Sequence, residues 1–228
     1  MSLSKRLTLI ASLVPYGARV CDIGTDHARL PIFLIENGRA ADVIACDVRE
    51  KPLEKARENI AAAGAVGITL LLCDGVPDER AEESGTDTVV IAGIGGEVIA
   101  GIIERSRYLC GEKRPLLILQ PTTSAEELRR FLCGKGYEIL SETPLFENGK
   151  LYSVMTVRYS GEKTAEDEFF FYTGLIEPKG DGRLYFEKQY ARLKSCADAL
   201  LTNENKRAEF EYYNGLAKKF ERILLNGE

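Results

Sequence analysis

The sequence lacks several features that would place it in a specialised class. None of its apolar runs approaches the roughly 18 uninterrupted residues of a membrane span, so we expect no membrane partner. It contains one histidine, His27, and its six cysteines include no Cys-x-x-Cys pair. Because a zinc site needs such ligands close together, we also expect no metal. An internal repeat or a low-complexity segment is equally missing, and 45% apolar with 29% charged residues is typical of a globular protein.

What is present begins with three apolar runs that each deliver a carboxylate at their C-terminal end. The first run, 20–24, contains Asp22 and is followed by the loop Thr25-Asp26-His27, the second ends at Asp47, and the third ends at Asp74. In an open parallel sheet, the C-terminal ends of the strands share one edge, where such folds bind ligands. We therefore predict a nucleotide-shaped pocket with several carboxylates at that edge.

The remaining pattern alternates strands with helices. Expected strands are 18–23, 42–47, 68–73, 87–92, 115–120, 137–142 and 151–159, and expected helices are 29–36, 50–63, 96–108 and 124–134, after an amphipathic helix within 1–14. Ser124 followed by Glu127 predicts a capping box. Asn148-Gly149 is a strong hairpin signal between the last two strands. The predicted fold class is therefore α/β: a Rossmann-like domain with a mixed seven-stranded sheet and one reversed strand.

The composition shifts after residue 160. Two apolar seams with a mean step of 3.5 residues follow, separated by a turn at 203–205, and this spacing predicts an antiparallel helical hairpin with coiled-coil packing. The seams are Phe186, Tyr190, Leu193, Ala197 and Leu200, then Phe210, Tyr213, Ala217, Phe220 and Leu224. We expect two domains: a Rossmann-like domain over 1–160 and a helical domain over 161–228.

The loop after the first strand distinguishes two nucleotide-like cofactors. A dinucleotide needs glycines there, so that backbone N–H groups can hold a pyrophosphate, but Asp26 stands at such a position and would repel it. S-adenosylmethionine carries an ammonium and a sulfonium, so acids become favourable. Asp47 can accept hydrogen bonds from ribose hydroxyls, and Asp74 can accept one from the adenine amine. Helix N-capping remains the alternative interpretation of each aspartate.

A glycine-rich segment, 92–96, follows the fourth expected strand and partly resembles a dinucleotide turn. Val98 replaces the last glycine of that pattern, and a single glycine loop is weak support for a cofactor. In a methyltransferase, the loop after the fourth strand borders the reactive methyl group of S-adenosylmethionine. We interpret 92–96 as such a loop, in which small residues let a substrate approach the methyl group. The expected cofactor site comprises Asp22, Gly24, Thr25, Asp26, His27, Asp47, Val48, Asp74, Gly75, Ala92, Gly93 and Gly95.

The partner stays open on charge alone. A net charge of −5 argues weakly against a nucleic acid, although phosphate binding depends on a local basic face rather than on the sum. Candidate basic residues flanking the pocket, which a solvated surface explains equally well, are Arg29, Arg49, Lys51, Lys113, Arg114, Arg129 and Arg130. Three of the cysteines lie in or at the ends of apolar runs, as small core residues of a reducing cytoplasm do.

Several motifs together resemble the bacterial tRNA adenine-N1 methyltransferases that modify position 22. They are Ser4-Lys5-Arg6-Leu7, the run from Asp22 to Pro31, Ile91 to Gly96, Leu117 to Pro121 and Glu147 to Tyr152. The resemblance implies a cytoplasmic enzyme that uses S-adenosylmethionine to methylate N1 of an adenine in tRNA. Two positions depart from the family pattern: Thr122 stands where asparagine is common, and Arg29 stands where tyrosine is common.

On this resemblance, the expected substrate-binding residues are Arg29, Gln120, Pro121 and Thr122, and the expected catalytic residues are Asp26 and His27. Three alternatives remain: a methyltransferase acting on a small molecule or a protein, an NAD-dependent oxidoreductase, and a non-catalytic module that associates through its helical hairpin. The first shares the cofactor and differs only in the acceptor.

Overall fold

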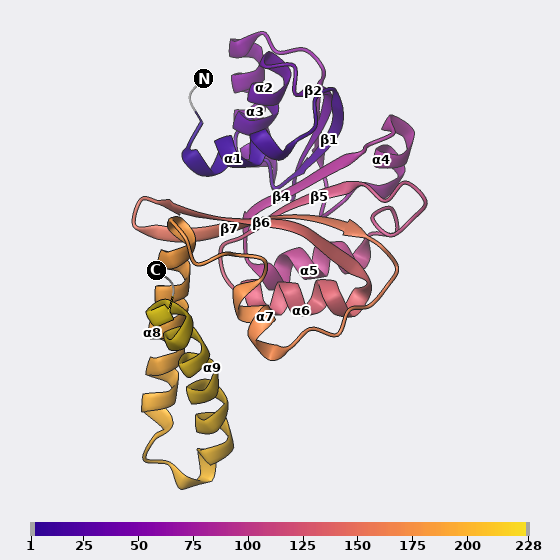
Figure 1. Ribbon diagram of the computed structural model, residues 1–228. Coiled ribbons are helices and arrows are strands. Elements are labelled where there is room, and N and C mark those ends of the chain that lie inside the picture. The colour runs from indigo at the N-terminus through magenta and orange to yellow at the C-terminus, as the bar shows by residue number, and fades with distance from the viewer. Residues whose placement is uncertain (1–2, 227–228) are drawn as a thin grey trace.

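Seven strands form one mixed sheet in the order β3-β2-β1-β4-β5-β7-β6 (Figure 1). The computed structural model describes residues 3–226, with Glu204 described by its backbone alone, so Met1, Ser2, Gly227 and Glu228 of the two predicted domains lie outside the described residues. The strands are β1 (Ala18–Ile23), β2 (Ala40–Asp47), β3 (Ile68–Leu72), β4 (Thr88–Ile94), β5 (Leu116–Pro121), β6 (Tyr137–Glu147) and β7 (Lys150–Tyr159). Strands β1 to β5 are parallel, and β7 runs antiparallel to both of its neighbours, β5 and β6. The predicted mixed sheet with one reversed strand is confirmed.

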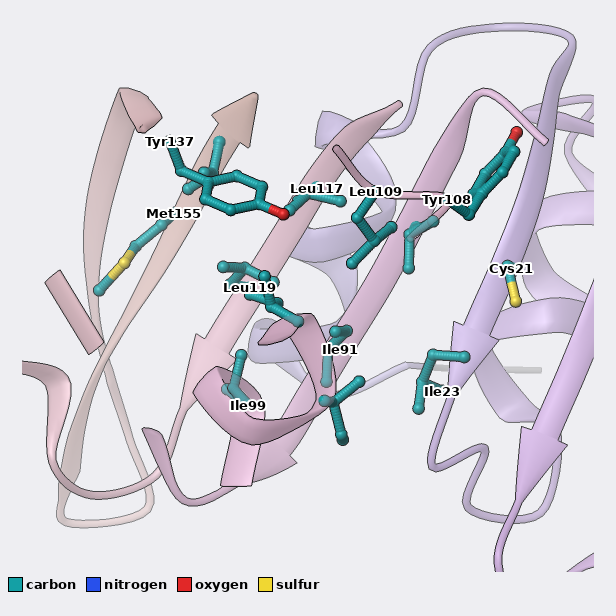
Figure 2. Packing of buried hydrophobic residues seen from close by; sticks show 14 of the residues in the cluster. Cys21, Ile23, Ile91, Ile99, Tyr108, Leu109, Leu117, Leu119, Tyr137 and Met155 are labelled. Atoms are coloured by element: carbon teal, nitrogen blue, oxygen red, sulfur yellow. The ribbon is translucent and has the colours of Figure 1, made fainter. Parts of the chain in front are cut away.

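Helices cover both faces of this sheet, as the near-continuous apolar character of the parallel strands requires. One face carries α1 (Lys5–Leu13), α2 (Arg29–Glu36) and α3 (Glu50–Ala63), and the other carries α4 (Asp78–Ser84), α5 (Gly96–Arg105) and α6 (Ala125–Lys135). Figure 2 shows the second layer, where Ile99 of α5 packs over Ile91 of β4 and Leu119 of β5. The C-terminal edge of the parallel strands therefore lies between two layers of helices that hold it in place.

The hairpin between β6 and β7 turns at Asn148 and Gly149, as predicted. Both residues have positive φ, 51° and 74°, which is the backbone that an Asn-Gly turn requires. The tip of this hairpin reaches the N-terminus of α1, where the carboxylate Oε1 of Glu147 accepts a hydrogen bond of 2.6 Å from the backbone N–H of Lys5. A carboxylate at a helix N-terminus is favourable. The contact fixes α1 against the hairpin.

Two local predictions about helices α5 and α6 are wrong. The helix expected over 96–108 ends at Arg105, because the carboxylate of Asp78 accepts bonds from the Ser106 hydroxyl at 2.6 Å and from the Arg107 N–H at 2.8 Å. The capping box is also absent: Ser124 adopts a left-handed backbone with φ 53°, and its side chain makes no capping bond to α6.

The C-terminal part of the chain forms α7 (Glu168–Thr173), α8 (Asp181–Leu200), the short turn η1 (Glu204–Lys206) and α9 (Arg207–Asn226). Helices α8 and α9 are antiparallel and project from the sheet as an arm (Figure 1). Its core contains the predicted seam residues Phe186, Leu193, Ala197, Ala217 and Phe220, together with Tyr185 and Leu216. The predicted helical hairpin is confirmed.

A buried ion pair joins this arm to the sheet. The Arg129 side chain of α6 is fully buried, and its guanidinium forms a two-point pair with the Glu142 carboxylate of β6, with distances of 2.5 Å and 3.1 Å. The same guanidinium donates to the carbonyl of Phe171 in α7 at 2.6 Å and to the hydroxyl of Tyr185 in α8 at 3.0 Å. One side chain thus links four elements, and the prediction that Arg129 flanks the pocket is wrong.

Candidate functional site

A cavity of about 790 Å³ opens at the C-terminal edge of the parallel strands, within the size range of small-molecule sites. It lies where the strand order reverses, beside β1 and β4, which is the position at which open α/β sheets bind ligands. Lining residues from the strand ends, the loops that follow them and the start of α2 are Asp22, Ile23, Gly24, Thr25, Asp26, Arg29, Leu30, Asp47, Val48, Arg49, Cys73, Asp74, Gly75, Ala92, Gly93 and Ile94. The predicted pocket is therefore present at the predicted edge.

The loop after β1 is held in an unusual backbone conformation. Gly24 has φ 77°, and the N–H groups of Gly24 and Thr25 both donate to the carbonyl of Cys46 at 2.8 Å. His27 and Ala28 follow with φ 61° and 55°, values that cost energy outside glycine. The Asn59 side chain of α3 donates to the His27 carbonyl at 2.9 Å and helps to hold this turn. The loop is therefore shaped before a ligand arrives.

The four aspartates at this edge fall into two pairs. Asp22 and Asp47 are each 6% exposed, whereas the side chains of Asp26 and Asp74 are 82% and 74% exposed. The alternative of helix N-capping is not supported, because α2, α3 and α4 begin after Ala28, Arg49 and Pro77 without a side-chain capping bond. Asp47 instead accepts a 2.9 Å bond from the N–H of Arg49. None of these acids is therefore used to cap a helix, although Asp47 and Asp74 each have an arginine nearby, Arg49 at 3.6 Å and Arg105 at 3.3 Å.

Burial raises the pKa of Asp22 to about 6, and the negative charge of Asp47 adds to the effect. The Thr25 side chain partly offsets this rise in the pKa, although its hydroxyl oxygen has no hydrogen-bond partner of acceptable geometry among the described residues. A buried hydroxyl without a partner is costly. Asp22 and Thr25 together form a polar end of the cavity that a ligand with hydrogen-bond donors would complete.

The raised pKa of Asp22 gives the site a pH dependence. A cationic ligand binds the ionised carboxylate, so its affinity should rise with pH between about 5 and 7 and be roughly tenfold weaker at pH 5 than at the plateau. Protein stability should change in the opposite direction. The folded state holds an extra proton on Asp22 between about pH 4 and 6, so the free energy of unfolding falls as pH rises through that range.

Calorimetric titration with S-adenosylhomocysteine from pH 5 to 8 measures the change in ligand affinity. The matched Asp22→Asn variant should bind more weakly and with a flat pH profile; a wild-type profile as flat as that of the variant would contradict the assignment.

The chemistry of this end of the cavity fits a cationic ligand that carries hydroxyl groups. Two buried carboxylates, two exposed ones and an unpartnered hydroxyl favour an ammonium, a sulfonium and a ribose over a pyrophosphate, which four acids would repel. Val48, which is 62% exposed, and Ile94 offer apolar surface to a flat ring. Within residues 3–226, no group of three or more His, Cys, Asp or Glu side chains could hold a metal ion. The residues thus fit the cofactor expected from the sequence.

The structure brings together most of the predicted cofactor residues and leaves out others. His27, Gly95, Pro121 and Thr122 do not line the cavity. A side-chain carbon on Gly96 would clash with the carbonyl oxygen of Ser124. Glycine at that position therefore allows α5 to approach the loop before α6, a packing role rather than a substrate contact.

Gln120, a predicted substrate contact, is fully buried behind the cavity wall. Its Oε1 accepts bonds from Arg6 at 2.6 Å and from the N–H of Gly93 at 3.1 Å, and its amide nitrogen donates to the carbonyl of Pro121 at 2.8 Å. Arg29 and Arg49 of the predicted basic residues line the cavity, whereas Arg130 pairs with Glu168 elsewhere.

Sequence reasoning missed one end of the cavity altogether. Its lining comes from α1 and the β6–β7 hairpin, with α5 closing another side, and comprises Leu3, Ser4, Arg6, Leu7, Glu147, Asn148, Tyr152, Val98 and Ile102. Helical periodicity predicted only that α1 covers the domain. It could not predict that α1 contacts the hairpin, because the two segments lie more than 130 residues apart in the chain. The motifs around Arg6 and Tyr152 were the available signal.

Comparisons with known proteins agree with this geometry. Residues 3–155 match the family model of a methyltransferase domain. The tRNA (adenine(22)-N(1))-methyltransferase of Bacillus subtilis is 34% identical over 178 residues, which cover 77% of this chain and 73% of that protein. The crystal structure of the Bacillus subtilis m1A22 tRNA methyltransferase has a TM-score of 0.79 at 26% identity, over 98% of this chain and 99% of that one. A candidate tRNA (m1A22) methyltransferase from Streptococcus pneumoniae, in complex with S-adenosyl-L-methionine, has a TM-score of 0.81 at 29% identity, over 98% and 100% of the two chains.

Proposed function

Since this chain belongs to the family of the tRNA (adenine(22)-N(1))-methyltransferases, we propose that it transfers the methyl group of S-adenosylmethionine to N1 of an adenine in tRNA, at position 22. The single observation that carries the proposal is the row of aspartates at the ends of β1, β2 and β3 within one cavity. These acids suit a cationic cofactor, and the cavity has a second end beyond them where an acceptor can enter.

S-adenosylmethionine supplies a methyl group made electrophilic by its sulfonium. The acceptor nitrogen N1 of adenine already carries a lone pair, so the chain needs no base to create the nucleophile. Its main task is to hold N1 and the methyl carbon about 3–3.5 Å apart and in line, an effect worth up to ~7–11 kcal/mol in favourable cases. We assign the ribose hydroxyls to Asp47 and the cationic end of the cofactor to Asp22, because these two carboxylates are buried in the cavity wall.

Asp26 is the residue to which we assign the developing charge on the adenine. It lines the cavity, whereas His27 does not, and the Nε2 atom of His27 lies 3.4 Å from Asp26 Oδ1. Methylation at N1 makes the base cationic, and a nearby carboxylate stabilises that charge or accepts the N6 proton. His27 would then orient Asp26 rather than contact the base.

Replacing Asp26 by asparagine should lower kcat about tenfold. The loss is moderate because this carboxylate is largely exposed, and solvent weakens its field. The measurement is steady-state methyl transfer at saturating substrates, together with the dissociation constant of S-adenosylhomocysteine, which should stay within about threefold of wild type. His27→Gln is the companion variant and should have the smaller effect. An unchanged kcat in Asp26→Asn would remove this residue from the mechanism.

The helical arm begins close to the hairpin that borders the cavity. The backbone N–H of Phe146, next to the hairpin tip, donates to Asp181 at the start of α8 at 2.8 Å, so the arm begins beside the hairpin that borders the cavity (Figure 1). We propose that residues 1–160 form the methyltransferase domain and 161–228 a helical domain that lies along the bound RNA.

Among residues 3–226, no helix combines the length and apolar character needed to cross a bilayer. With tRNA as its partner, we place the enzyme in the cytoplasm.

The test is transfer of labelled methyl from S-adenosylmethionine to unmodified tRNA, followed by nucleoside analysis. We expect 1-methyladenosine, and loss of the product when the tRNA carries guanosine at position 22. A tRNA already methylated at that position is the control acceptor. Absence of incorporation by a sample that binds S-adenosylhomocysteine would instead favour a small-molecule or protein acceptor with the same cofactor.

A further inference from the structure

The end of the cavity that the cofactor residues do not use is built from α1 and the β6–β7 hairpin. It is lined by Ser4, Arg6 and Leu7 on one side and by Glu147, Asn148 and Tyr152 on the other. The bond between the Lys5 N–H and Glu147 closes this end, and Arg6 connects it to Gln120 near the end of β5. The assignment of this end to part of the acceptor RNA, made below, rests on the proposed function.

Arg6 differs from two other arginines, Arg49 in the cavity wall and Arg105 beside it. Arg49 and Arg105 both face carboxylates, Asp47 at 3.6 Å and Asp74 at 3.3 Å. Arg6 is held instead by an uncharged partner, the Oε1 of buried Gln120 at 2.6 Å. That bond fixes the direction of the guanidinium without neutralising it. The fork of an arginine offers five N–H donors, so most of its donors remain for a ligand.

Tyr152 lies beside this guanidinium. The Arg6 Cζ atom is 5.8 Å from the centre of the Tyr152 ring, within the range of a cation–π contact. The Tyr152 side chain is half-buried and lines the cavity. An aromatic face next to an unneutralised arginine offers the two things that a nucleotide needs: a stacking surface and a cation for its phosphate.

We propose that Arg6 and Tyr152 form the subsite for the acceptor nucleotide, with Tyr152 stacking on the adenine and Arg6 binding a phosphate of the RNA backbone next to it. Arg6 binds the phosphate rather than the base for an electrostatic reason. Methylation at N1 leaves a cation on the base, and a guanidinium at the base edge would oppose the reaction. At the phosphate, the same charge favours binding and does not change during transfer.

The charges around this end agree with an RNA strand. The side chains of Lys5, Arg29 and Lys150 have no acidic partner among the described residues, although each lies on a segment that borders the cavity. The arm carries both kinds of cation: Arg192, Lys194, Lys206, Arg207 and Lys219 pair with acids, whereas Lys188, Lys218 and Arg222 have no acidic partner among the described residues. Positive charge without an acidic partner is therefore available at the cavity mouth, where a flipped adenine would enter.

The test compares Arg6→Gln with Arg39→Gln, a closely matched control. Arg39 also stacks on a tyrosine, with its Cζ 4.1 Å from the Tyr16 ring, and it also anchors α1, through the carbonyls of Ser12 and Val14. It lies just before β2, at the opposite edge of the sheet. We expect Arg6→Gln to bind unmodified tRNA about tenfold more weakly, with the slope of log affinity against log salt reduced by roughly 0.7–0.9, the value of one phosphate contact. The affinity for S-adenosylhomocysteine should stay within about twofold, and Arg39→Gln should leave both binding constants and the slope unchanged.

Two further variants separate the roles. Arg6→Lys should restore the salt slope, and Tyr152→Leu should raise the KM for tRNA with an unchanged slope, because it removes stacking and no charge. If Arg6→Gln and Arg39→Gln lower Tm alike and leave tRNA binding and the slope at wild-type values, Arg6 only anchors α1 and the proposal is overturned. If Arg6→Gln does not fold, an unchanged KM for tRNA in Tyr152→Leu overturns it instead. Wild-type protein that binds the cofactor product but neither binds nor methylates tRNA would refute the proposed function, a result distinguishable from failure of the subsite alone.

Discussion

An alanine at position 47 is expected to weaken the binding of S-adenosylhomocysteine at least 100-fold. The Asp47 carboxylate is 6% exposed at the end of β2 and lines the cavity, where it can accept two hydrogen bonds from a ribose. Each hydrogen bond to a buried charged group contributes about 1.5–3 kcal/mol, and two of them account for a loss of this size. Isothermal titration calorimetry measures the affinity directly.

The matched control for Asp47→Ala is Asp42→Asn. Asp42 belongs to the same strand but lies near its other end, where it pairs at the surface with Arg19 at 3.6 Å, and its replacement should leave the affinity unchanged. Asp47→Ala should also lower the pKa of Asp22, because the charge of Asp47 contributes to raising it. Native-like melting together with an affinity within threefold of wild type would show that the cofactor binds elsewhere.

Replacing Arg129 by methionine should cost about 3–5 kcal/mol of stability and lower Tm by roughly 6–20 °C. The substitution leaves the buried Glu142 carboxylate without its partner, and breaking one side of a buried ion pair is costly for that reason. A change of 1 kcal/mol shifts Tm by about 2–4 °C in a domain of this size. Thermal unfolding followed by circular dichroism provides the measurement.

Arg130→Met is the control, since the neighbouring arginine also forms a two-point pair, with Glu168, but at the surface: the two side chains are 46% and 38% exposed. Exposed pairs contribute about 0–1 kcal/mol, so this variant should melt close to wild type. The double variant Arg129→Met with Glu142→Leu should recover part of the loss, because it removes both charges. Equal melting temperatures for the two single variants would show that the buried pair adds nothing.

The sequence predicted the features that depend on local pattern. Apolar runs located all seven strands, and the Asn148-Gly149 dipeptide located the hairpin that reverses β7. The aspartates at the strand ends could be placed in one pocket, because parallel strands must end at a common edge. The two helices that the pattern missed, α4 and α7, are short: α4 buries only Ala81 and therefore lacks an apolar stripe, and α7 spans six residues.

The features that escaped prediction depend on contacts between distant segments. Arg129 looked like a surface base near the pocket, but its partner Glu142 lies 13 residues further along the chain on β6, and Tyr185 is 56 residues away. Gln120 looked like a substrate contact until the structure placed Arg6 against it, 114 residues earlier. Composition and periodicity carry no information about such pairs, so only the folded chain shows that the motifs around Arg6 and Tyr152 meet at one end of the cavity.

The bond between Lys5 and Glu147 spans 142 residues, and it sets an order of events during protein synthesis. Helix α1 precedes all seven strands in the chain, yet the hairpin on which it rests contains the last two strands of the sheet to be synthesised. While β1 to β5 are already available to form the acid-lined half of the cavity, the half that contains Arg6 and Tyr152 must wait for the hairpin. The cofactor half of the cavity is therefore built from residues that are synthesised before the hairpin, whereas the acceptor half is complete only after β6 and β7 have been made.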